Sequence, residues 1–392
     1  MRIGIDLRIA DGPSGQQRYL WRLGRWLGDA GHDVHLLVSR HAPPEDVAER
    51  TPRATVADLA GLPRQQFRRR VRDLELDVLL LNPERSDHYA GIGANLLRPG
   101  YGTDQYRQKL RSFRNPLERG ARRLLRALPP VRGKRTRERR FYEGTTPTPD
   151  VVAISDRMRT EVLDTYAVDP DRVHVVPNGV DVETFCPAVR EALRTEARAE
   201  FGLPADALCI LMVAHNYRLK GVRPAMDQVA RLRAAGLDAH LLVAGRGTSR
   251  LQRRRAAAWA RARGLVGATH LPGVVHPVTR AYAAADVFLH PTWHDAFGNV
   301  VLEAMACGLP PLTSPWAGAA MVVEDGVSGY VVDPAEGVTL HRRLVELADG
   351  EHREHMGRAA RATAERHDEP TNFRAMERLC ELAATRTPGP VR

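Results

Sequence analysis

The sequence predicts an α/β protein built from two doubly wound, Rossmann-like domains that follow one another along the chain. Short apolar runs alternate with helical stretches throughout, which is typical of α/β domains with parallel sheets. The length of 392 residues is enough for about two domains, each with its own core. Because the strand–helix pattern fills two successive halves of similar size, we expect a cleft between two lobes.

The strand candidates of the first half are short runs dominated by Val, Ile and Leu. They are Ile3–Leu7, Val34–Val38, Val78–Leu81, Ala94–Leu97, Val151–Ile154 and Val173–Val176. An amphipathic helix over Tyr19–Ala30 separates the first two strands and ends at Gly31. These elements predict a first domain over residues 1–186, in which residues 98–149 interrupt the pattern as a basic, helical excursion.

The second half repeats the alternation. Its strand candidates are Leu208–Ala214, Ala239–Ala244, Thr269–Leu271, Val287–His290, Pro311–Thr313 and Gly329–Val332. Its main helices are expected at Pro224–Ala235, Leu251–Arg263, Val278–Ala284 and Val300–Cys307. The proline-flanked stretch Pro187–Pro204 is interpreted as a hinge region that opens a second domain over residues 187–370. A last helix, about Asn372–Ala384, lies within residues 371–392.

Composition and cysteine spacing exclude several classes of protein. No apolar run approaches the roughly 20 residues that a membrane span needs, and Met1 leads directly into a strand, so no signal peptide is expected. The four cysteines are far apart and form no Cys-x-x-Cys pair, which argues against a disulfide framework and against a zinc site. We therefore expect a cytoplasmic enzyme or binding protein.

The net charge of +11 is concentrated in one segment. Between Gln105 and Tyr142 there are 14 Lys or Arg residues and two acids, Glu118 and Glu138. Because a nucleic-acid-binding protein more often spreads its basic residues over a groove, no nucleic acid is expected as partner. The segment is compatible with a surface helix packed on its own domain, a helix lying on an anionic bilayer, or a basic lid that receives a phosphorylated acceptor.

The stretch from His290 to Pro310 has the most specific chemistry. A loop carboxylate, Asp295, precedes a glycine at a predicted helix start, and a second carboxylate, Glu303, follows one helical turn later. Asn299 is the N-cap candidate, and the unpaired N–H groups of the first turn form an anion site. A phosphate at that helix start with carboxylates on either side suits a nucleotide sugar; a capped helix with a solvated Glu303 is the alternative.

Three further motifs lie where parallel strands end. Gly15 follows the first strand and opens the first helix, where a glycine lets backbone N–H groups approach phosphates. Asn178-Gly179 closes the last strand of the first half and is also a turn signal. Arg218 and Lys220 follow the first strand of the second half, where they can meet a diphosphate.

Taken together, these motifs resemble the retaining glycosyltransferases of family 4, which have the two-lobed GT-B fold. The resemblance covers nearly the whole chain and rests on the turn at Gly15, Gly31-His-Asp33-Val34, Ser155, Val-Pro-Asn178-Gly-Val-Asp181, Lys220-Gly221, Val243-Ala-Gly245, Ala285-Asp286-Val and Glu303-Ala-Met-Ala-Cys-Gly308. Within the family, Gly100-Tyr-Gly102-Thr-Asp104 through Glu138-Arg-Arg-Phe141-Tyr142 is most similar to the lipopolysaccharide-core sugar transferases.

The resemblance implies a role for each matching residue. Glu303 is expected to hold the ribose hydroxyls of the nucleotide, and Asp295 the donor sugar, although the family has a glutamate at the latter position. Arg218 and Lys220 match the cations that bind the diphosphate. The backbone N–H groups of Phe297, Gly298, Asn299 and Val300, with Gly15 from the other lobe, are expected to contact the diphosphate or sugar. Asp104 falls where many relatives keep a histidine near the reacting centre.

The implied activity is transfer of a sugar, with retention of configuration, from a nucleoside diphosphate sugar to a hydroxyl of a glycan, glycolipid or natural product. UDP-hexose is the expected donor, with GDP- or ADP-sugars as alternatives. No metal or other cofactor is expected, because Lys220, Arg218 and the helix start can neutralise the leaving diphosphate. The last helix is expected to cross back to the first lobe. Contact of residues 105–142 with the inner face of the plasma membrane is one of the three roles that stay open for this segment.

Two other classes of protein stay open at this point. A non-hydrolysing sugar-nucleotide epimerase has the same bilobed fold, but it needs additional acid–base carboxylates that the sequence does not identify. A scaffold without turnover is the non-enzyme alternative, with Arg107–Arg140 binding membrane or RNA. The donor base, the sugar, the acceptor and the oligomeric state do not follow from the sequence.

Overall fold

The computed structural model describes residues 1–7, 15–38, 53–82, 89, 92, 94–100, 139–143 and 148–386 of the chain. By the packing of its backbone the chain divides into unit 1 (Met1–Val176 with Asn372–Arg392) and unit 2 (Pro177–Thr371). Most of the basic segment 105–142, and with it Asp104, lies outside the described residues. None of the described helices combines the length and apolar character needed to cross a bilayer.

Unit 1 contains a seven-stranded parallel sheet with the strand order β3-β2-β1-β4-β5-β6-β7. Its strands are β1 (Arg2–Asp6), β2 (Asp33–Val38), β3 (Ala54–Asp58), β4 (Val78–Leu81), β5 (Leu96–Leu97), β6 (Asp150–Ala153) and β7 (Val173–Val175). Its helices are α1 (Gly15–Asp29), α3 (Arg64–Arg72), α7 (Asp156–Thr165) and most of α15 (Glu369–Arg386), and a 3-10 turn, η2 (Pro170–Arg172), precedes β7. All strand pairs are parallel, and the helices α1, α3 and α7 make the crossovers from β1 to β2, from β3 to β4 and from β6 to β7.

The C-terminal helix α15 packs on the core of unit 1. Met376 and Cys380 are fully buried among β1 and α1 side chains, and the hydroxyl of Tyr19 donates to Asn372 over 2.7 Å. At the far end of the helix, Arg386 donates to the buried Asp150 carboxylate over 2.6 Å. The last described residues of the chain therefore complete the first unit.

Unit 2 contains a six-stranded parallel sheet with the strand order β10-β9-β8-β11-β12-β13. Its strands are β8 (Leu208–Val213), β9 (Ala239–Ala244), β10 (Thr269–Gly273), β11 (Val287–His290), β12 (Pro311–Thr313) and β13 (Tyr330–Val331). Its helices are α8 (Pro187–Phe201), α9 (Val222–Ala234), α10 (Arg250–Ala262), α11 (Thr279–Ala284), α12 (Asn299–Ala306), α13 (Gly337–Glu346) and α14 (Gly350–Arg366), with a 3-10 turn, η3 (Gly318–Val322).

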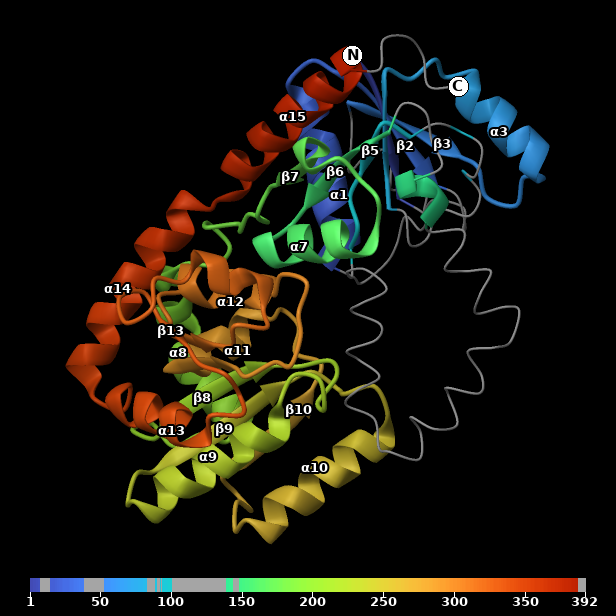
Figure 1. Cartoon of the computed structure of the whole chain (residues 1–392). Helices are drawn as coiled ribbons and strands as arrows, with labels where there is room; N and C mark the ends of the chain where they lie inside the picture. The colour runs from blue at the N-terminus through green and yellow to red at the C-terminus, as the bar shows by residue number, and fades with distance from the viewer. Residues whose placement is uncertain are drawn as a thin grey trace. The chain divides into compact units, whose positions relative to one another are not determined.

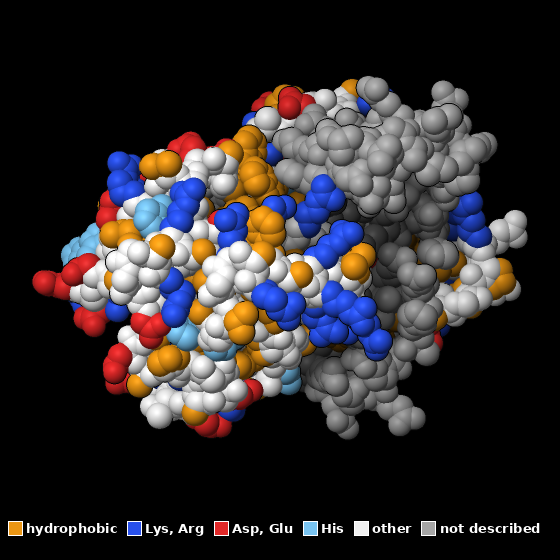
Figure 2. Space-filling view, turned by 90° about the horizontal axis from the view of Figure 1, so that it is seen from below, with side chains coloured by type: hydrophobic (Ala, Val, Ile, Leu, Met, Phe, Trp, Pro, Cys, Tyr) orange, Lys and Arg blue, Asp and Glu red, His pale blue; other side chains and the backbone are white. Residues whose placement is uncertain are grey.

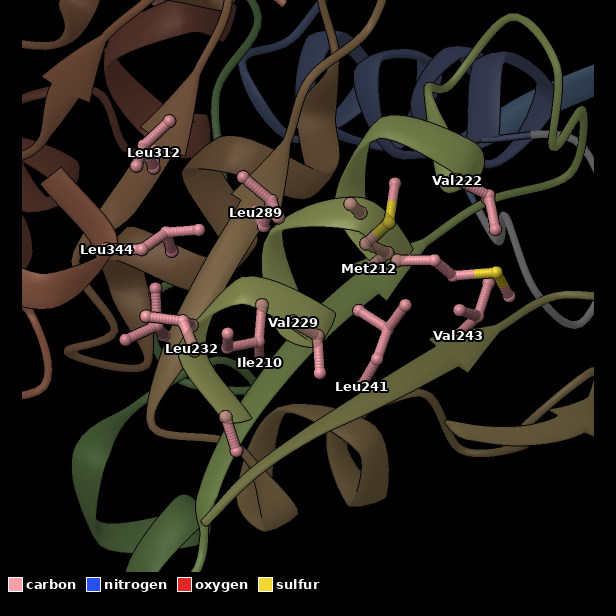
Figure 3. Close-up of a cluster of buried hydrophobic side chains, with 14 of the residues drawn as sticks. Ile210, Met212, Val222, Val229, Leu232, Leu241, Val243, Leu289, Leu312 and Leu344 are labelled. Atoms are coloured by element: carbon pink, nitrogen blue, oxygen red, sulfur yellow. The ribbon is translucent and has the colours of Figure 1, made fainter. Parts of the chain in front are cut away.

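Helices cover both faces of the unit 2 sheet. Helices α9, α10 and α13 pack together over one face, whereas α11 packs on α8, and α12 on α14, over the other (Figure 1). Under α9, buried aliphatic side chains from three strands meet those of the helix, among them Ile210, Leu241, Leu289 and Val229 (Figure 3). Each such buried side chain stabilises the fold by roughly 1.5–3 kcal/mol, which makes this sheet a rigid platform for the loops at its edge.

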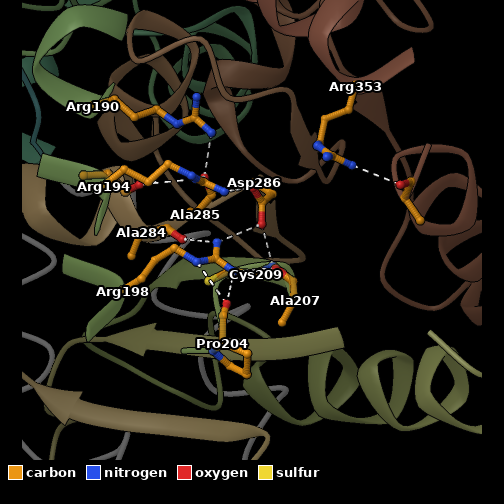
Figure 4. A network of polar contacts seen from close by, with 12 residues as sticks. Arg190, Arg194, Arg198, Pro204, Ala207, Cys209, Ala284, Ala285, Asp286 and Arg353 are labelled. Atoms are coloured by element: carbon orange, nitrogen blue, oxygen red, sulfur yellow. Dashed lines mark hydrogen bonds and ion pairs between the residues drawn. The ribbon is translucent and has the colours of Figure 1, made fainter. Parts of the chain in front are cut away.

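Helix α8 binds the end of α11 through three arginines spaced four residues apart. Arg190 and Arg194 donate to the carbonyl of Ala285, and Arg198 donates to that of Ala284 (Figure 4). Arg194 and Arg198 also bind the buried Asp286 carboxylate, at 2.6 and 3.2 Å. Asp286 in turn accepts the N–H of Cys209 in β8, so the network fixes β11 against β8. The proline-flanked stretch predicted as a hinge is thus an anchored helix of unit 2.

Basic side chains also gather on α10 of unit 2, at the lower end of Figure 1. No acidic residue occurs between Asp238 and Asp286. Helix α10 itself has four exposed arginines, Arg250, Arg253, Arg254 and Arg255, in its first two turns. Figure 2 shows Lys and Arg side chains gathered on the face seen from below. A second local cluster of basic residues therefore lies outside residues 105–142, although acids elsewhere in the chain balance its charge.

Candidate functional site

The candidate site of unit 2 lies where β8 and β11 end. These two strands are parallel neighbours, so the loops that follow them leave the same edge of the sheet. The two loops are joined by hydrogen bonds: the N–H of Trp293 and the hydroxyl of Thr292 both donate to the carbonyl of Leu219, at 2.9 and 3.2 Å. The backbone at Gly221 has φ +71° and packs directly against the carbonyl of Pro291, where a Cβ would clash. This contact brings Lys220 beside Asp295.

Lys220, Asp295 and His290 form a compact charged cluster. The Lys220 ammonium donates to Asp295 Oδ2, and His290 Nε2 lies 3.2 Å from the same oxygen. The side chains of Lys220 and Asp295 are 17% and 20% exposed, whereas that of His290 is 1% exposed. Burial by itself would raise the pKa of the Asp295 carboxyl, but the Lys220 ammonium and the contact with His290 hold that pKa below its ordinary value. Burial lowers the pKa of His290, and Lys220 lowers it further.

Lys220 is unusual in this chain. Among 58 basic residues only three are lysines, Lys109, Lys134 and Lys220, and only Lys220 lies in the described residues. A lysine ammonium is a compact charge with three N–H donors, whereas a guanidinium is a wide planar fork. One donor is used by Asp295, so the ammonium keeps the capacity to bind a second anion.

Helix α12 begins at Asn299, directly after a glycine with a left-handed backbone. Gly298 is the N-cap residue, with φ 95°, so the prediction that Asn299 caps the helix is wrong by one residue. The reason is steric: a Cβ at Gly298 would lie 3.2 Å from Asp295 Oδ2 and 3.3 Å from His290 Nε2. The amide oxygen of Asn299 accepts instead from Asn178 Nδ2 over 2.7 Å. The first-turn N–H groups of Asn299 and Val300 have no acceptor within the helix.

Backbone hydrogen bonds hold the loop before α12 in place. Asp295 exchanges backbone hydrogen bonds with Trp316 and Gly318, both at 3.0 Å, and the carbonyl of Phe297 accepts from Ala319 over 2.7 Å. The Phe297 side chain is buried. The loop therefore presents the start of α12 in one fixed orientation, which favours binding of a ligand without reorganisation.

Glu303 lies on the second turn of α12 and has a protein partner that the sequence did not predict. The hydroxyl of Tyr282 in α11 donates to Glu303 Oε2 over 2.7 Å and also contacts the carbonyl of Val300 at 3.3 Å. Tyr282 is fully buried, and burial, followed by the Glu303 charge, raises its pKa well above the ordinary value. The protonated hydroxyl of Tyr282 therefore fixes the orientation of the half-buried Glu303 carboxylate.

Three other predicted site residues, Arg218, Gly15 and Asp104, take no part in the contacts described above. Arg218 is exposed, and its side chain makes no hydrogen bond or ion pair within the described part of the chain. Gly15 is the first residue of α1 in unit 1. Asp104 lies outside the described residues. Thus the structure brings Lys220, Asp295, Gly298, Asn299 and Val300 together, with Glu303 one turn along the same helix.

Sequence reasoning missed three polar side chains of this site. His290 was assigned only to the end of a strand and Tyr282 only to a helix, and Asn178 was treated as part of a turn. A polar residue at the carboxyl end of a buried strand was the available signal for His290.

The described residues contain no cluster of three or more His, Cys, Asp or Glu side chains able to hold a metal ion. Asp169-Pro-Asp171, which mimics a metal-binding motif, forms a 3-10 turn: the Asp169 carboxylate accepts the N–H of Asp171 over 2.9 Å.

Comparison with known proteins identifies the family. Residues 13–184 match the family model described as Glycosyltransferase Family 4, and residues 207–349 match that described as Glycosyl transferases group 1. The D-inositol 3-phosphate glycosyltransferase of Geodermatophilus obscurus is 33% identical over 228 residues, which cover 53% of this chain and 50% of that protein. The chain thus spans about half the length of the curated relatives that it matches.

Solved structures share the fold over the whole chain. WaaG, a glycosyltransferase involved in lipopolysaccharide biosynthesis, aligns with a TM-score of 0.71 at 19% identity and covers 97% of this chain and 99% of its own. Anabaena HepE in complex with UDP-glucose aligns with a TM-score of 0.72 at 17% identity and covers 98% and 100%. The chain therefore contains a Glycosyltransferase Family 4 domain followed by a Glycosyl transferases group 1 domain, and it has the GT-B fold of these solved structures.

Proposed function

We propose that the protein is a retaining glycosyltransferase that moves a sugar from a nucleoside diphosphate sugar to a hydroxyl group. The main support is the cluster at the edge of the unit 2 sheet. There a lysine ammonium, a carboxylate and the start of a helix converge from the loops after β8 and β11. Family membership gives the class of reaction, and the geometry suggests which atoms serve it.

The diphosphate of the donor is proposed to bind at the start of α12. The N–H groups of Asn299 and Val300 point out of the helix, whose dipole favours an anion at this end. Lys220 has N–H donors left after it binds Asp295, and Arg218 is free to move toward a phosphate. These groups would stabilise the negative charge that develops on the leaving diphosphate, so no metal ion is required for the proposed step.

The donor sugar is proposed to bind beside Asp295. Its ionised carboxylate accepts hydrogen bonds, and Lys220 and His290 fix its position. An aspartate reaches one methylene less far than the glutamate of the family pattern, which favours a donor sugar that sits closer to β11. UDP-hexose is the proposed donor, because HepE was solved with UDP-glucose and shares the fold. Donors based on GDP or ADP are the alternatives.

Glu303 is proposed to bind the ribose hydroxyls of the nucleotide. Tyr282 donates to one carboxylate oxygen and sets the orientation of the group, and an ionised carboxylate has several acceptor positions for ribose hydroxyls. This arrangement explains why a half-buried carboxylate occurs on an otherwise apolar helix.

The acceptor is proposed to be a hydroxyl of a phosphorylated polyol, glycan or glycolipid. The curated relatives are named D-inositol 3-phosphate glycosyltransferases, and a phosphorylated acceptor would suit the basic residues of segment 105–142. Two roles stay predictions for residues that no observation tests: Gly15 as a phosphate contact and Asp104 near the acceptor. Contact of segment 105–142 with the inner face of the plasma membrane also stays a prediction.

A panel of nucleotide sugars tests the proposal. Each donor is first added to the protein in a thermal unfolding assay, where a donor at 100 times its Kd adds about 2.7 kcal/mol of stability. The stabilising donor is then incubated with and without inositol phosphate or glycan acceptors, and the products are separated and their anomeric configuration determined. A glycoside of retained configuration supports the proposal. An epimerised nucleotide sugar formed from donor alone, or liposome or RNA binding without any turnover, would replace it.

A further inference from the structure

Two cysteines of unit 2 lie at the ends of different helices. Cys186 is the N-cap residue of α8 and is half-buried, whereas Cys307 is the C-cap residue of α12 and is 3% exposed. The proposed transfer reaction uses neither thiol. Both are free cysteines.

The residues on either side of the two cysteines are in contact. Arg361 of α14 donates from one guanidinium nitrogen, Nη1, to the carbonyl of Phe185 at 2.9 Å and to the carbonyl of Ala306 at 2.8 Å. These are the residues immediately before Cys186 and Cys307. Because one nitrogen holds both oxygens, the two carbonyls lie within about 6 Å of each other.

The residues immediately after the cysteines are also adjacent. A Cβ built on Gly308 would lie 3.5 Å from Cγ of Pro187, which is ordinary van der Waals contact. Contacts before and after the cysteines indicate that two short segments run side by side, with Cys186 and Cys307 at matching positions along them. Disulfides typically join Cα atoms that are about 4.4–6.8 Å apart, so this juxtaposition is of the right scale.

We propose that Cys186 and Cys307 form a reversible disulfide when the protein meets a hydroperoxide. The peroxide oxidises the more exposed Cys186 thiol to a sulfenic acid and leaves as water or an alcohol. The Cys307 sulfur then attacks the Cys186 sulfur, the S–O bond breaks, and the hydroxide takes the Cys307 proton to leave as water. One S–S bond is formed, and two thiols are oxidised by one peroxide.

The two thiols have different surroundings, which suit these two roles. Burial raises the pKa of the Cys307 thiol to about 12, and the Glu303 charge acts in the same direction, while Arg190 opposes both. Cys307 therefore stays protonated in the resting protein and is shielded from oxidants, which leaves Cys186 as the thiol of the pair that forms the sulfenic acid. Cys209 in β8 and Cys380 in α15 are fully buried, and burial raises the pKa of each thiol to about 12.

The disulfide would attach the end of α12 covalently to the segment before α8. The N–H of Cys307 donates to the carbonyl of Glu303, so the constrained turn is the one that contains the proposed ribose-binding residue. The thiol chemistry itself does not depend on the proposed function, because it is measured without donor or acceptor.

The test is a thiol map of the full-length protein. The protein is treated with hydrogen peroxide, denatured, alkylated and digested, with and without later reduction by dithiothreitol. We expect two of the four thiols to be lost, a mass lower by two hydrogen atoms, and one linked peptide pair joining Cys186 to Cys307, all reversed by dithiothreitol. Cys209 and Cys380 serve as internal references and should stay fully alkylated.

The matched variant is Cys186→Ser, which keeps a good N-cap at a half-buried position and should fold. In this variant no linked peptide should form and Cys307 should remain alkylated after peroxide treatment. Four alkylated thiols in the treated wild type would overturn the proposal. A linkage to Cys209 or Cys380, a bond between two molecules, or irreversible oxidation of Cys186 alone would overturn it as well.

Discussion

Replacing Lys220 with methionine removes the ammonium group but keeps most of the length and apolar contacts of the side chain. Asp295 is then left with His290 as its remaining partner, 3.2 Å away. Breaking a buried ion pair from one side costs about 3–5 kcal/mol, whereas an exposed pair contributes about 0–1 kcal/mol. Because the two side chains are 17% and 20% exposed, we expect an intermediate loss of about 2 kcal/mol in the free energy of unfolding at pH 7.

The pH dependence of that loss follows from the lowered pKa of Asp295. Burial raises this pKa and Lys220 lowers it, so the variant should have a higher Asp295 pKa than the wild type. A carboxyl with a depressed pKa stabilises the folded state above its unfolded pKa, about 3.9, and this contribution is lost as the pH falls below it. The stability difference between wild type and Lys220→Met should therefore shrink from pH 7 toward pH 3.

The proposed function predicts a larger effect on activity. Loss of a preorganised cation at the leaving diphosphate should lower kcat/KM about 100-fold or more, equivalent to about 2.7 kcal/mol. Lys220→Arg should restore only part of it, because the planar guanidinium does not match the compact ammonium. Urea unfolding and a chromatographic transfer assay measure the two effects, with Arg358→Met, at an exposed arginine of α14, as the control for loss of one positive charge.

A double-mutant cycle with Asp295→Asn tests whether Lys220 and Asp295 stabilise the protein as a pair or independently of each other. If the pair acts as a unit, the stability losses of Lys220→Met and Asp295→Asn are not additive, with a coupling of about 0.5–3 kcal/mol. Strict additivity in stability together with near-normal turnover of Lys220→Met would refute the reasoning about this cluster.

Three further changes test other parts of the account. Gly298→Ala places a Cβ 3.2 Å from Asp295 Oδ2 at a residue with a left-handed φ. The change should lower the free energy of unfolding by about 1–2 kcal/mol and weaken nucleotide binding, which calorimetry measures. An unchanged affinity would contradict the fixed orientation of the helix start. Tyr282→Phe removes the donor to Glu303 and should raise the Kd for the nucleotide about 5–10-fold, a loss of about 1 kcal/mol; an unchanged Kd would separate Glu303 from nucleotide binding. Asp286→Asn should cost about 3–5 kcal/mol at pH 7 by breaking the buried pair with Arg194. Burial would raise the Asp286 pKa, but Arg194 and its other partners hold that pKa below the ordinary value. The difference in the free energy of unfolding between wild type and Asp286→Asn should therefore narrow as the pH falls below about 4. A difference that stays constant with pH would contradict this.

The parallel strands of unit 2 were predicted closely because they are buried on both faces. Val287–His290 and Pro311–Thr313 match β11 and β12 at both ends, since short, mainly apolar runs close to glycine or proline residues leave little freedom. The edge strand β3 (Ala54–Asp58) was missed in the first half. None of its residues is fully buried, so its sequence lacks the continuous apolar signal of a central strand.

The side-chain pairings of the site could not be predicted, because they join residues far apart in the sequence. Lys220 and Asp295 are separated by 75 residues and Asn178 and Asn299 by 121, and only the folded sheet brings each pair together. The shift of the α12 cap to Gly298 has a related cause. It depends on how closely the helix start approaches Asp295, which local cap preferences do not contain.

The most direct test of the central proposal is a crystal structure of the protein with UDP bound. We expect the β-phosphate to lie within about 3 Å of the N–H groups of Asn299 or Val300 and of the Lys220 ammonium, with the ribose hydroxyls on Glu303. Ordered UDP at any other place in the molecule, with the start of α12 still facing solvent, would contradict the proposal.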